Sequence, residues 1–414
     1  MDDQPVGRRV AYWRTRRRMS QKVFADRLGK SKSWVDKVER GVRRLDKFST
    51  IAEIAQVLQI DVAALMSGRE QIRRPDGPGD IGHGEVAAIR AALERYDTIS
   101  ALHAPICPAM PLTELRKAVD HAWMTFQRAN YTTLARLLPK LIHDAQSADG
   151  ADDGGPRSGT YLLGEVYQLA SSMLCKLGEH ALAWLAADRA ITVCQRSGDD
   201  LLAVLATDQV AAALSALGRI EPALHISVYL AQDIAPNEER EATPQRLSVY
   251  GTVLLRGALA AARLGDSTAS RDLLSAAEEA AKRVGEANFY WTSFGPTNVA
   301  FYQVAVELEL GEPDRALRTH HGIDQDGYAA MLPERRASHL LDVARAHKQV
   351  GEMDRAEESI VTAHRLAPNE VRCRPDAQEL VADLMRSSGG RPVPGMLELA
   401  DQIGLSGAAA VARV

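Results

Sequence analysis

The stretch Val350–Pro368, VGEMDRAEESIVTAHRLAP, sets the pattern for most of this chain. A glycine follows an apolar residue at its start, alanines stand 5 and 12 positions after that glycine, and a proline closes it. Small residues at helical spacing let two helices approach closely, and the proline stops the second helix. The stretch therefore predicts a turn at Gly351 and a helix that ends before Pro368.

The same pair of an apolar residue and a glycine recurs through the chain. Pairs of an apolar residue and a glycine stand at 177–178, 217–218, 264–265, 310–311 and 350–351, so the glycines are 40, 47, 46 and 40 residues apart. Alanines again follow at Ala183 and Ala190, and at Ala316. Such a period predicts helical hairpins stacked into a solenoid. We expect a less regular first unit in 112–148, and a short apolar helix from about Met396.

These repeats resemble the tetratricopeptide repeat, although their spacing exceeds its 34 residues and most of its consensus aromatic residues are missing. The resemblance implies a right-handed helical solenoid, so the predicted fold class is all-α. Aromatic residues make up only 5% of the 414 residues, which argues against a β-sandwich or barrel.

Composition also narrows the function classes. No run of 18 apolar residues predicts a membrane span, and the charged N-terminus does not resemble a secretory signal. Cys107, Cys175, Cys194 and Cys373 lack metal-ligand spacing, which indicates buried thiols in a reducing cytoplasm. We find no nucleophile elbow, P-loop or histidine spacing suited to a metal, so we expect no enzyme, no cofactor and no metal.

Charge is distributed unevenly along the chain. Residues 1–74 hold 18 Lys+Arg and 9 Asp+Glu, a net of +9, whereas the other 340 residues hold 32 and 45, a net of −13. A basic segment of this size predicts a polyanionic partner, and nucleic acid is the usual one. Six of the ten residues in 75–84 are Gly or Pro, which indicates a linker. The predicted domains are a basic domain at 1–72, a linker at 73–84, repeats at 85–372 and capping helices at 373–414.

The basic segment predicts five short helices, with Ser20 and Ser31 capping the second and third. It resembles the helix-turn-helix domain of Xre-type regulators over residues 6–68. The resemblance depends on a set of residues: Ser20, Gln21, Ala25, Leu28, Gly29, Val35, Val38, Glu39 and Gly41. It also implies a buried ion pair between Arg14 and Glu39.

In this family the third helix enters the major groove of DNA. The positions implied to contact bases are Lys32, Ser33 and Lys37, and those implied to contact phosphates are Gln21, Trp34, Arg43, Arg44 and Lys47. Trp34 either packs on the sugar-phosphate backbone or covers the helix junction. The alternative for the whole domain is a helix-turn-helix that binds only protein.

In tetratricopeptide-like hairpins the first helix of each pair lines a concave groove. The resemblance, together with an aromatic cluster at 289–302 that holds six of the 21 aromatic residues, predicts a ligand groove. Its expected residues are Gln168, Asp208, Gln209, Arg256, Tyr290, Trp291, Phe294, Asn298, Phe301, Tyr302, Asp342 and Arg345. We expect Asn298 to hold a ligand amide. The alternative is that these aromatic residues only fill the packing between adjacent hairpins.

The full arrangement resembles the cytoplasmic quorum-sensing regulators of the RRNPP type and their actinobacterial relatives. The resemblance implies a homodimeric transcriptional regulator that binds a palindromic operator in double-stranded DNA and is controlled by a peptide or small-molecule signal. Two alternatives stay open: a protein-interaction scaffold tethered to DNA, and a ligand-independent regulator whose repeats only oligomerise.

Overall fold

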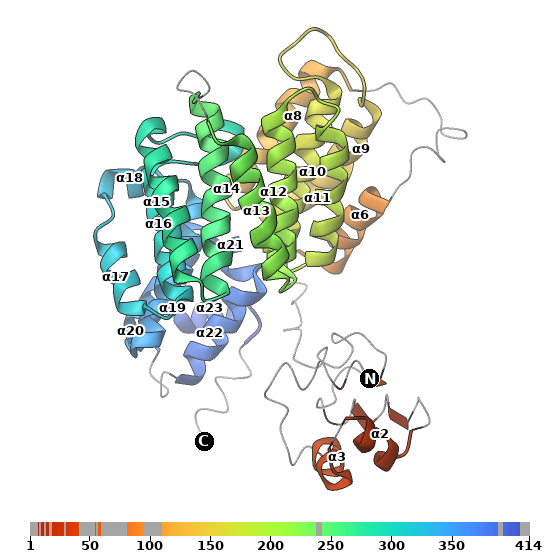
Figure 1. The fold of residues 1–414 in the computed structure, drawn as a ribbon, viewed down its shortest axis with the longest axis vertical. Helices are drawn as coiled ribbons and strands as arrows, with labels where there is room; N and C mark the ends of the chain where they lie inside the picture. The colour runs from red at the N-terminus through yellow and green to blue at the C-terminus, as the bar shows by residue number, and fades with distance from the viewer. Residues whose placement is uncertain are drawn as a thin grey trace. The chain divides into compact units, whose positions relative to one another are not determined.

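The computed structural model divides the chain into two compact units, 1–74 and 75–414, each described here by itself (Figure 1). It describes residues 19–28, 30–40, 81–94, 110–236, 242–387 and 392–405, and the single positions 7, 10, 11, 14, 15, 54, 57 and 58. Every element in this part of the chain is helical, which confirms the all-α prediction. In the same part of the chain, no helix combines the length and apolar character needed to cross a membrane.

In the first unit, two helices are described over their full length: α2 (Gln21–Arg27) and α3 (Lys32–Glu39). Each begins at a predicted cap. The Ser20 hydroxyl accepts from the backbone N–H of Val23 at 3.2 Å, and the Ser31 hydroxyl accepts from that of Trp34 at 3.1 Å. The rest of the predicted five-helix arrangement, and most of the predicted linker, lie outside the described residues.

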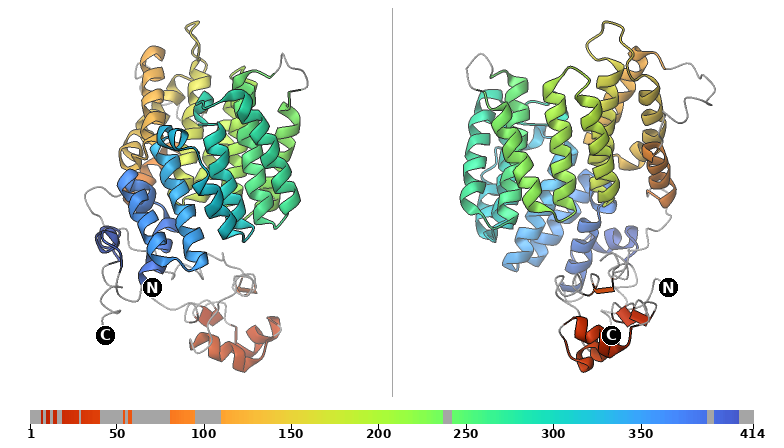
Figure 2. Two further views of the ribbon diagram at one scale, coloured as in Figure 1. Left: turned by 90° about the vertical axis from the view of Figure 1, so that its left-hand side faces the viewer. Right: turned by 45° about the vertical axis from the view of Figure 1, so that its right-hand side comes forward.

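The second unit consists of helices packed side by side (Figures 1 and 2). Six hairpins account for most of it: α8 (Leu112–Gln127) with α9 (Tyr131–Ser147), α10 (Gly159–Lys176) with α11 (His180–Cys194), α12 (Asp200–Ala216) with α13 (Ile220–Ile234), α14 (Pro244–Arg263) with α15 (Ser267–Val284), α16 (Pro296–Glu309) with α17 (Pro313–His321), and α19 (Pro333–Val350) with α20 (Met353–Leu366).

Six shorter or flanking helices complete the described part of the second unit. They are α6 (His83–Glu94), η2 (Phe289–Trp291), α18 (Gln325–Ala330), α21 (Pro368–Arg372), α22 (Pro375–Ser387) and α23 (Met396–Gln402), with α6 packed against α9 and α23 against α20 and α22.

The predicted turn glycines occupy the turns of five hairpins, with φ between 76° and 86°. At each one, the glycine N–H and the following N–H bond back to carbonyls of the preceding helix, as in the Schellman motif. The first hairpin makes the same turn with Ala129, at φ 55°. The predicted alanines are buried against the partner helix: Ala183, Ala190, Ala316, Ala356 and Ala363. The hairpin prediction is therefore confirmed.

The first helices of the six hairpins contact one another in chain order: α8, α10, α12, α14, α16 and α19. The last of them, α19, also contacts α8, so the series closes on itself. We call these six helices the inner ring. One hydrophobic cluster accordingly joins residues of α6–α12 with residues of α19–α23, while a second fills α12–α16. The helices after 373, expected as a terminal cap, pack Pro375 against the Gly178 turn.

Candidate DNA-contacting helix and repeat-domain interior

Helix α3 presents the three side chains predicted to contact bases. Lys32, Ser33 and Lys37 are all exposed, whereas Val35 and Val38 are buried in the small core. Because Ser33 and Lys37 are four positions apart, they lie on the same face of the helix. The exposed face of α3 is therefore polar and basic.

The buried Arg14–Glu39 pair is confirmed. The Arg14 guanidinium donates from Nε to Glu39 Oε1 at 2.5 Å and from Nη2 to Oε2 at 3.0 Å. Gln21 also donates from Nε2 to Glu39 Oε2, at 2.8 Å. The Gln21 side chain, which was expected to contact phosphate, therefore makes a hydrogen bond within the protein. Its contact with phosphate stays a prediction.

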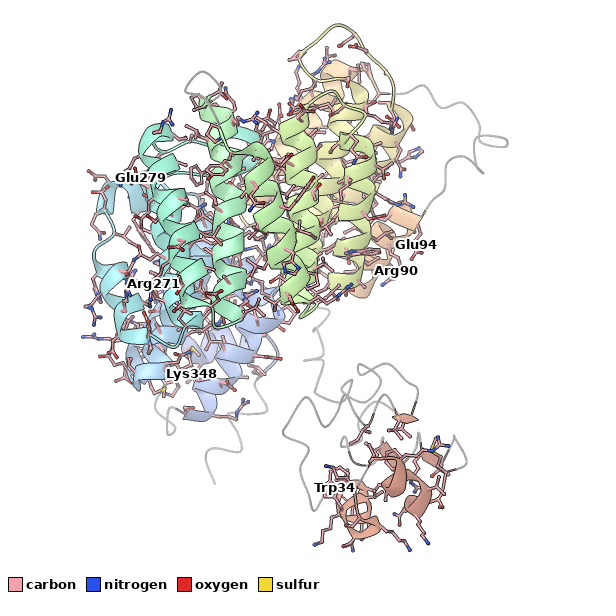
Figure 3. The ribbon with its side chains drawn as sticks, viewed as in Figure 1. Trp34, Arg90, Glu94, Arg271, Glu279 and Lys348 are labelled. Carbon is pink, nitrogen blue, oxygen red and sulfur yellow. The ribbon has the colours of Figure 1, made fainter. Side chains whose placement is uncertain are left out.

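Trp34, labelled in Figure 3, is half-buried and packs against the core that contains Phe24, Ala25 and Val35. Of the two roles considered for it, covering the helix junction is the one the free protein displays. The other expected phosphate contacts, Arg43, Arg44 and Lys47, lie outside the described residues.

Ion pairs join inner-ring residues to one another and to α22. Asp208 on α12 accepts from Arg256 Nε on α14 at 2.6 Å, and Arg345 on α19 contacts both Asp342 and Asp376, each at 2.7 Å. The expected groove residues Asp208, Arg256, Asp342 and Arg345 thus each form an ion pair within the protein. Two oxygens of expected groove residues, Asp208 Oδ2 and Asn298 Oδ1, are buried without a hydrogen-bond partner.

A second cluster of charged residues links α10 to α19 and α21. Lys176 on α10 pairs with Glu334 on α19 and, at 2.6 Å, with Glu370 on α21. Tyr131 donates its hydroxyl to the same Glu370 at 2.5 Å, and Arg374 contacts it at 2.9 Å. Burial would raise the pKa of Glu334, but Lys176 and Arg335 lower it to about 2.

These closing residues were missed by sequence reasoning. Glu370 and its partner Tyr131 are 239 positions apart. The only available signal was the presence of ionisable residues at positions where the helical pattern expects apolar ones.

Two expected groove residues lie in the packing between helices instead. Gln168 is buried, and its amide donates to Leu202 O at 3.3 Å on the neighbouring hairpin. Phe294 is fully buried against Gly251, where even a single added methyl group would collide with its ring. In this structure each side chain therefore packs helices together, and its place in a ligand groove stays a prediction.

Five other expected groove residues split between packing and partial exposure. Phe301 is buried and stacks on His339, with ring centroids 4.1 Å apart and an interplanar angle of 7°. Tyr302, Tyr290, Trp291 and Gln209 are half-buried. For Phe301 the packing alternative is therefore the one observed.

Two histidines, one on α17 and one on α19, lie within hydrogen-bonding distance of each other. His320 Nδ1 lies 2.9 Å from His339 Nε2. Burial lowers the pKa of His339 to about 3 and that of His320 to about 4, in each case with a neighbouring imidazole adding to the effect. The pair is therefore neutral near pH 7, with one ring donating to the other.

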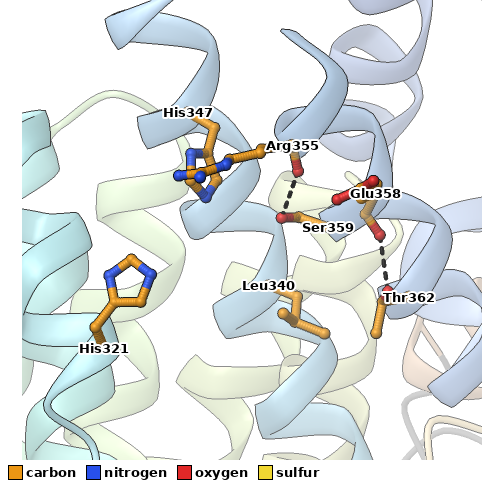
Figure 4. Close-up of a pocket in the computed structure, with 7 residues that line it drawn as sticks. All are labelled: His321, Leu340, His347, Arg355, Glu358, Ser359 and Thr362. Carbon is orange, nitrogen blue, oxygen red and sulfur yellow. Dashed lines mark hydrogen bonds between the residues drawn. The ribbon is translucent and has the colours of Figure 1, made fainter. Parts of the chain in front are cut away.

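An open pocket of about 320 Å³ lies beside this pair, between α17, α19 and α20 (Figure 4). His321 faces His347 and Arg355 across it, and the Ser359 and Thr362 hydroxyls are bonded back to their own helix. None of the expected groove residues lines this pocket.

The connection between α15 and α16 has unusual backbone geometry. Tyr290, Trp291 and Ser293 have φ of 50°, 61° and 53°, in the left-handed region. Each costs a non-glycine residue roughly 1–2 kcal/mol. Such strain persists only where surrounding contacts over-determine the conformation.

Residues 5–66 match the family model described as "Helix-turn-helix domain", so the N-terminal unit carries such a domain. No curated protein matches the chain. Among solved structures, the chain is similar to that described as Bacillus thuringiensis PlcR in complex with the peptide PapR7 and DNA. The TM-score is 0.37 and the identity 11%, over 85% of this chain and 99% of that chain.

Proposed function

We propose that this protein is a sequence-specific DNA-binding transcriptional regulator. The observation that carries the proposal is the exposed polar face of α3, with Lys32, Ser33 and Lys37, on a helix-turn-helix domain. Lysine can donate to guanine O6 and N7 in the major groove, and serine accommodates several bases. The net charge of +9 over residues 1–74 adds attraction to the phosphates.

The proposal includes a homodimer on a palindromic operator. Two recognition helices fit successive major grooves when their half-sites are about 34 Å apart, or a multiple of that distance. A change of a few ångströms in their separation therefore switches binding. A peptide or small-molecule signal held by the repeat domain would supply that change by preferring one arrangement of the hairpins. The buried, unpartnered oxygens of Asp208 and Asn298 support a polar ligand there.

The test starts by recovering genomic fragments bound by the full chain and searching them for an inverted repeat. Operator affinity is then measured for Lys32→Ala and Lys37→Ala. We expect each variant to lose about 1–3 kcal/mol of specific binding, because each lysine donates to a base edge.

Lys117→Ala is the matched control, since it removes an exposed lysine from α8 in the other unit. Wild-type operator affinity in both α3 variants would reject this recognition surface. Fragments without an inverted repeat would reject the symmetric dimer but leave the α3 contacts open to direct measurement.

A ligand-independent regulator is the second candidate, favoured by the ion pairs that the inner-ring residues make with one another. Its test compares the operator affinity of the purified protein with and without an extract of the source cells. A shift in affinity excludes this candidate, and an unchanged affinity supports it.

A further inference from the structure

The connection between α15 and α16 forms a loop that is closed at its base. The backbone N–H of Ala287 donates to the carbonyl of Phe294 at 3.1 Å, and Glu286 accepts from the N–H of Thr297 at 2.8 Å. Phe294 itself is fully buried against α14. Residues 288–293, which we call the strap, therefore begin and end at one fixed base.

The strap is held down by side chains from distant parts of the chain. The Trp291 indole stacks on Trp123 of α8, with ring centroids 5.9 Å apart and planes 7° apart, and its Nε1 donates to Glu165 of α10 at 2.8 Å. The Tyr290 hydroxyl donates to Asp199, the N-cap of α12, at 2.9 Å.

Gln127 also forms hydrogen bonds to the strap, both to its backbone and to the Asn288 side chain. Gln127 of α8 donates from Nε2 to the carbonyl of Trp291 at 3.2 Å and to Asn288 Oδ1 at 3.1 Å, while Asn288 Nδ2 donates back to Gln127 Oε1 at 3.0 Å. The strap thus contacts three successive hairpins, whose residues lie 91 to 168 positions earlier in the chain.

The side chains beneath the strap carry groups of the kinds that bind extended peptides. Trp123 supplies a flat aromatic face, Gln127 an amide that pairs with a backbone carbonyl, and Glu165 and Asp199 carboxylates that accept from side-chain donors. Stacking and amide pairing of this kind are how proteins hold an extended segment. Tyr290 and Trp291 are only half-buried, so the contact is reachable from outside.

The backbone of the strap is strained in the conformation that makes these contacts. Three of its six residues adopt left-handed φ, which the surface contacts must offset. A separate peptide with the same side chains could make the same contacts without being forced through that backbone path.

We propose that the strap is a built-in occupant of a peptide-binding surface formed by Trp123, Gln127, Glu165 and Asp199. An extended peptide with adjacent aromatic side chains that carry hydrogen-bond donors displaces it. Displacement unlinks the α15–α16 connection from the first three hairpins, and so alters how the hairpins are coupled. A resulting change in DNA binding would rest on the proposed function, whereas the displacement itself does not.

The first test is hydrogen exchange on the full chain. We expect the amides of 288–293 to exchange through a local opening, much faster than those of α14 and α16. Exchange of the strap at the rate of these flanking helices would overturn the proposal, because the strap would then be a fixed part of the core.

The second test adds the strap in trans as a dye-labelled synthetic peptide, Asn-Phe-Tyr-Trp-Thr-Ser-Phe, and follows binding by fluorescence polarisation. Trp291→Ala removes the main anchor of the strap and frees the surface. We expect this variant to bind the peptide roughly tenfold or more tighter than the wild type, because its binding-competent fraction is larger. Trp184→Ala, which removes an exposed tryptophan of α11, is the matched control and should bind as the wild type does.

Tyr290→Phe is the second variant, should Trp291→Ala unfold. It deletes only the hydroxyl that donates to Asp199, so its fold is retained while the strap loosens. If no variant binds this peptide better than a scrambled peptide of the same composition, the surface is not a peptide site. Neither test contains DNA, so its outcome is independent of whether α3 binds an operator.

Discussion

Glu39 is the residue on which the described part of the helix-turn-helix unit depends most. Its carboxylate is buried and accepts from Arg14 and Gln21, and Arg14 also donates from Nη1 to the carbonyl of Met19 at 2.7 Å. One side chain therefore joins α3 to α2 and to the segment before α2. The two charges are paired and desolvated together, which makes the loss of either one costly.

We predict that Glu39→Ala destabilises this unit by about 3–5 kcal/mol, because it leaves the Arg14 charge buried and unpaired. Asp36→Asn is the control, since Asp36 pairs with Arg40 in solvent, where ion pairs contribute about 0–1 kcal/mol. Urea unfolding followed by circular dichroism, with hydrogen exchange to assign the transition, measures both. Equal stability of the two variants would contradict the structural role of Glu39.

At the scale of elements, the hairpin turn is the repeated unit of the second domain. Its geometry follows from local bonding: a left-handed residue lets two successive N–H groups reach back to the helix end. Gly311 has φ 76°, and nothing lies within 4 Å of the place a β-carbon would occupy. A substitution there tests backbone strain without steric overlap.

Gly311→Ala is predicted to destabilise the repeat domain by roughly 1–2 kcal/mol, the cost of a left-handed alanine. Gly84→Ala is the matched control, because Gly84 also has open space around it but lies in α6 without a positive φ. There alanine should stabilise by up to about 1 kcal/mol, since it favours the helix. Denaturant midpoints of the two variants should therefore shift in opposite directions, and a shift in the same direction would show that the turn is not strained.

At the scale of the whole molecule, the second unit depends on contacts between its first and last hairpins. Glu370 is fully buried and accepts from Tyr131, Lys176 and Arg374, which come from α9, α10 and the residues after α21. These bonds hold the inner ring closed. The surface pairs of the same unit, such as Arg90–Glu94 and Glu279–Lys282, are exposed. Arg90, Glu94 and Glu279 are labelled in Figure 3.

We predict that Glu370→Ala destabilises the repeat domain by about 3–5 kcal/mol, because Lys176 and Arg374 lose a buried partner. Glu279→Ala removes an exposed partner of Lys282 and should change stability by about 0–1 kcal/mol. Chemical denaturation of the full chain compares the two. A small effect at Glu370 would mean that the ring closes through its apolar contacts alone.

The exposure of Lys32, Ser33 and Lys37 was predictable from sequence because it depends on residues within one helix. It follows from the cap at Ser31 and the apolar positions Val35 and Val38, whereas their contacts with DNA are implied by the family resemblance and stay predictions. The ligand groove was not predictable in the same way. Gln168 lies on α10 and Phe294 in the connection before α16, but neighbouring helices approach closely enough to bury both side chains.

The sequence by itself determined the helices, their caps, the glycine turns and the buried alanines, because each depends on bonds or packing between residues a few positions apart. Only the tertiary structure decided that α19 returns to α8, that Glu370 meets Tyr131, and that the strap covers α8, α10 and α12. These contacts join residues 90 or more positions apart. They depend on the summed rotation of successive hairpins, which no local pattern in the sequence encodes.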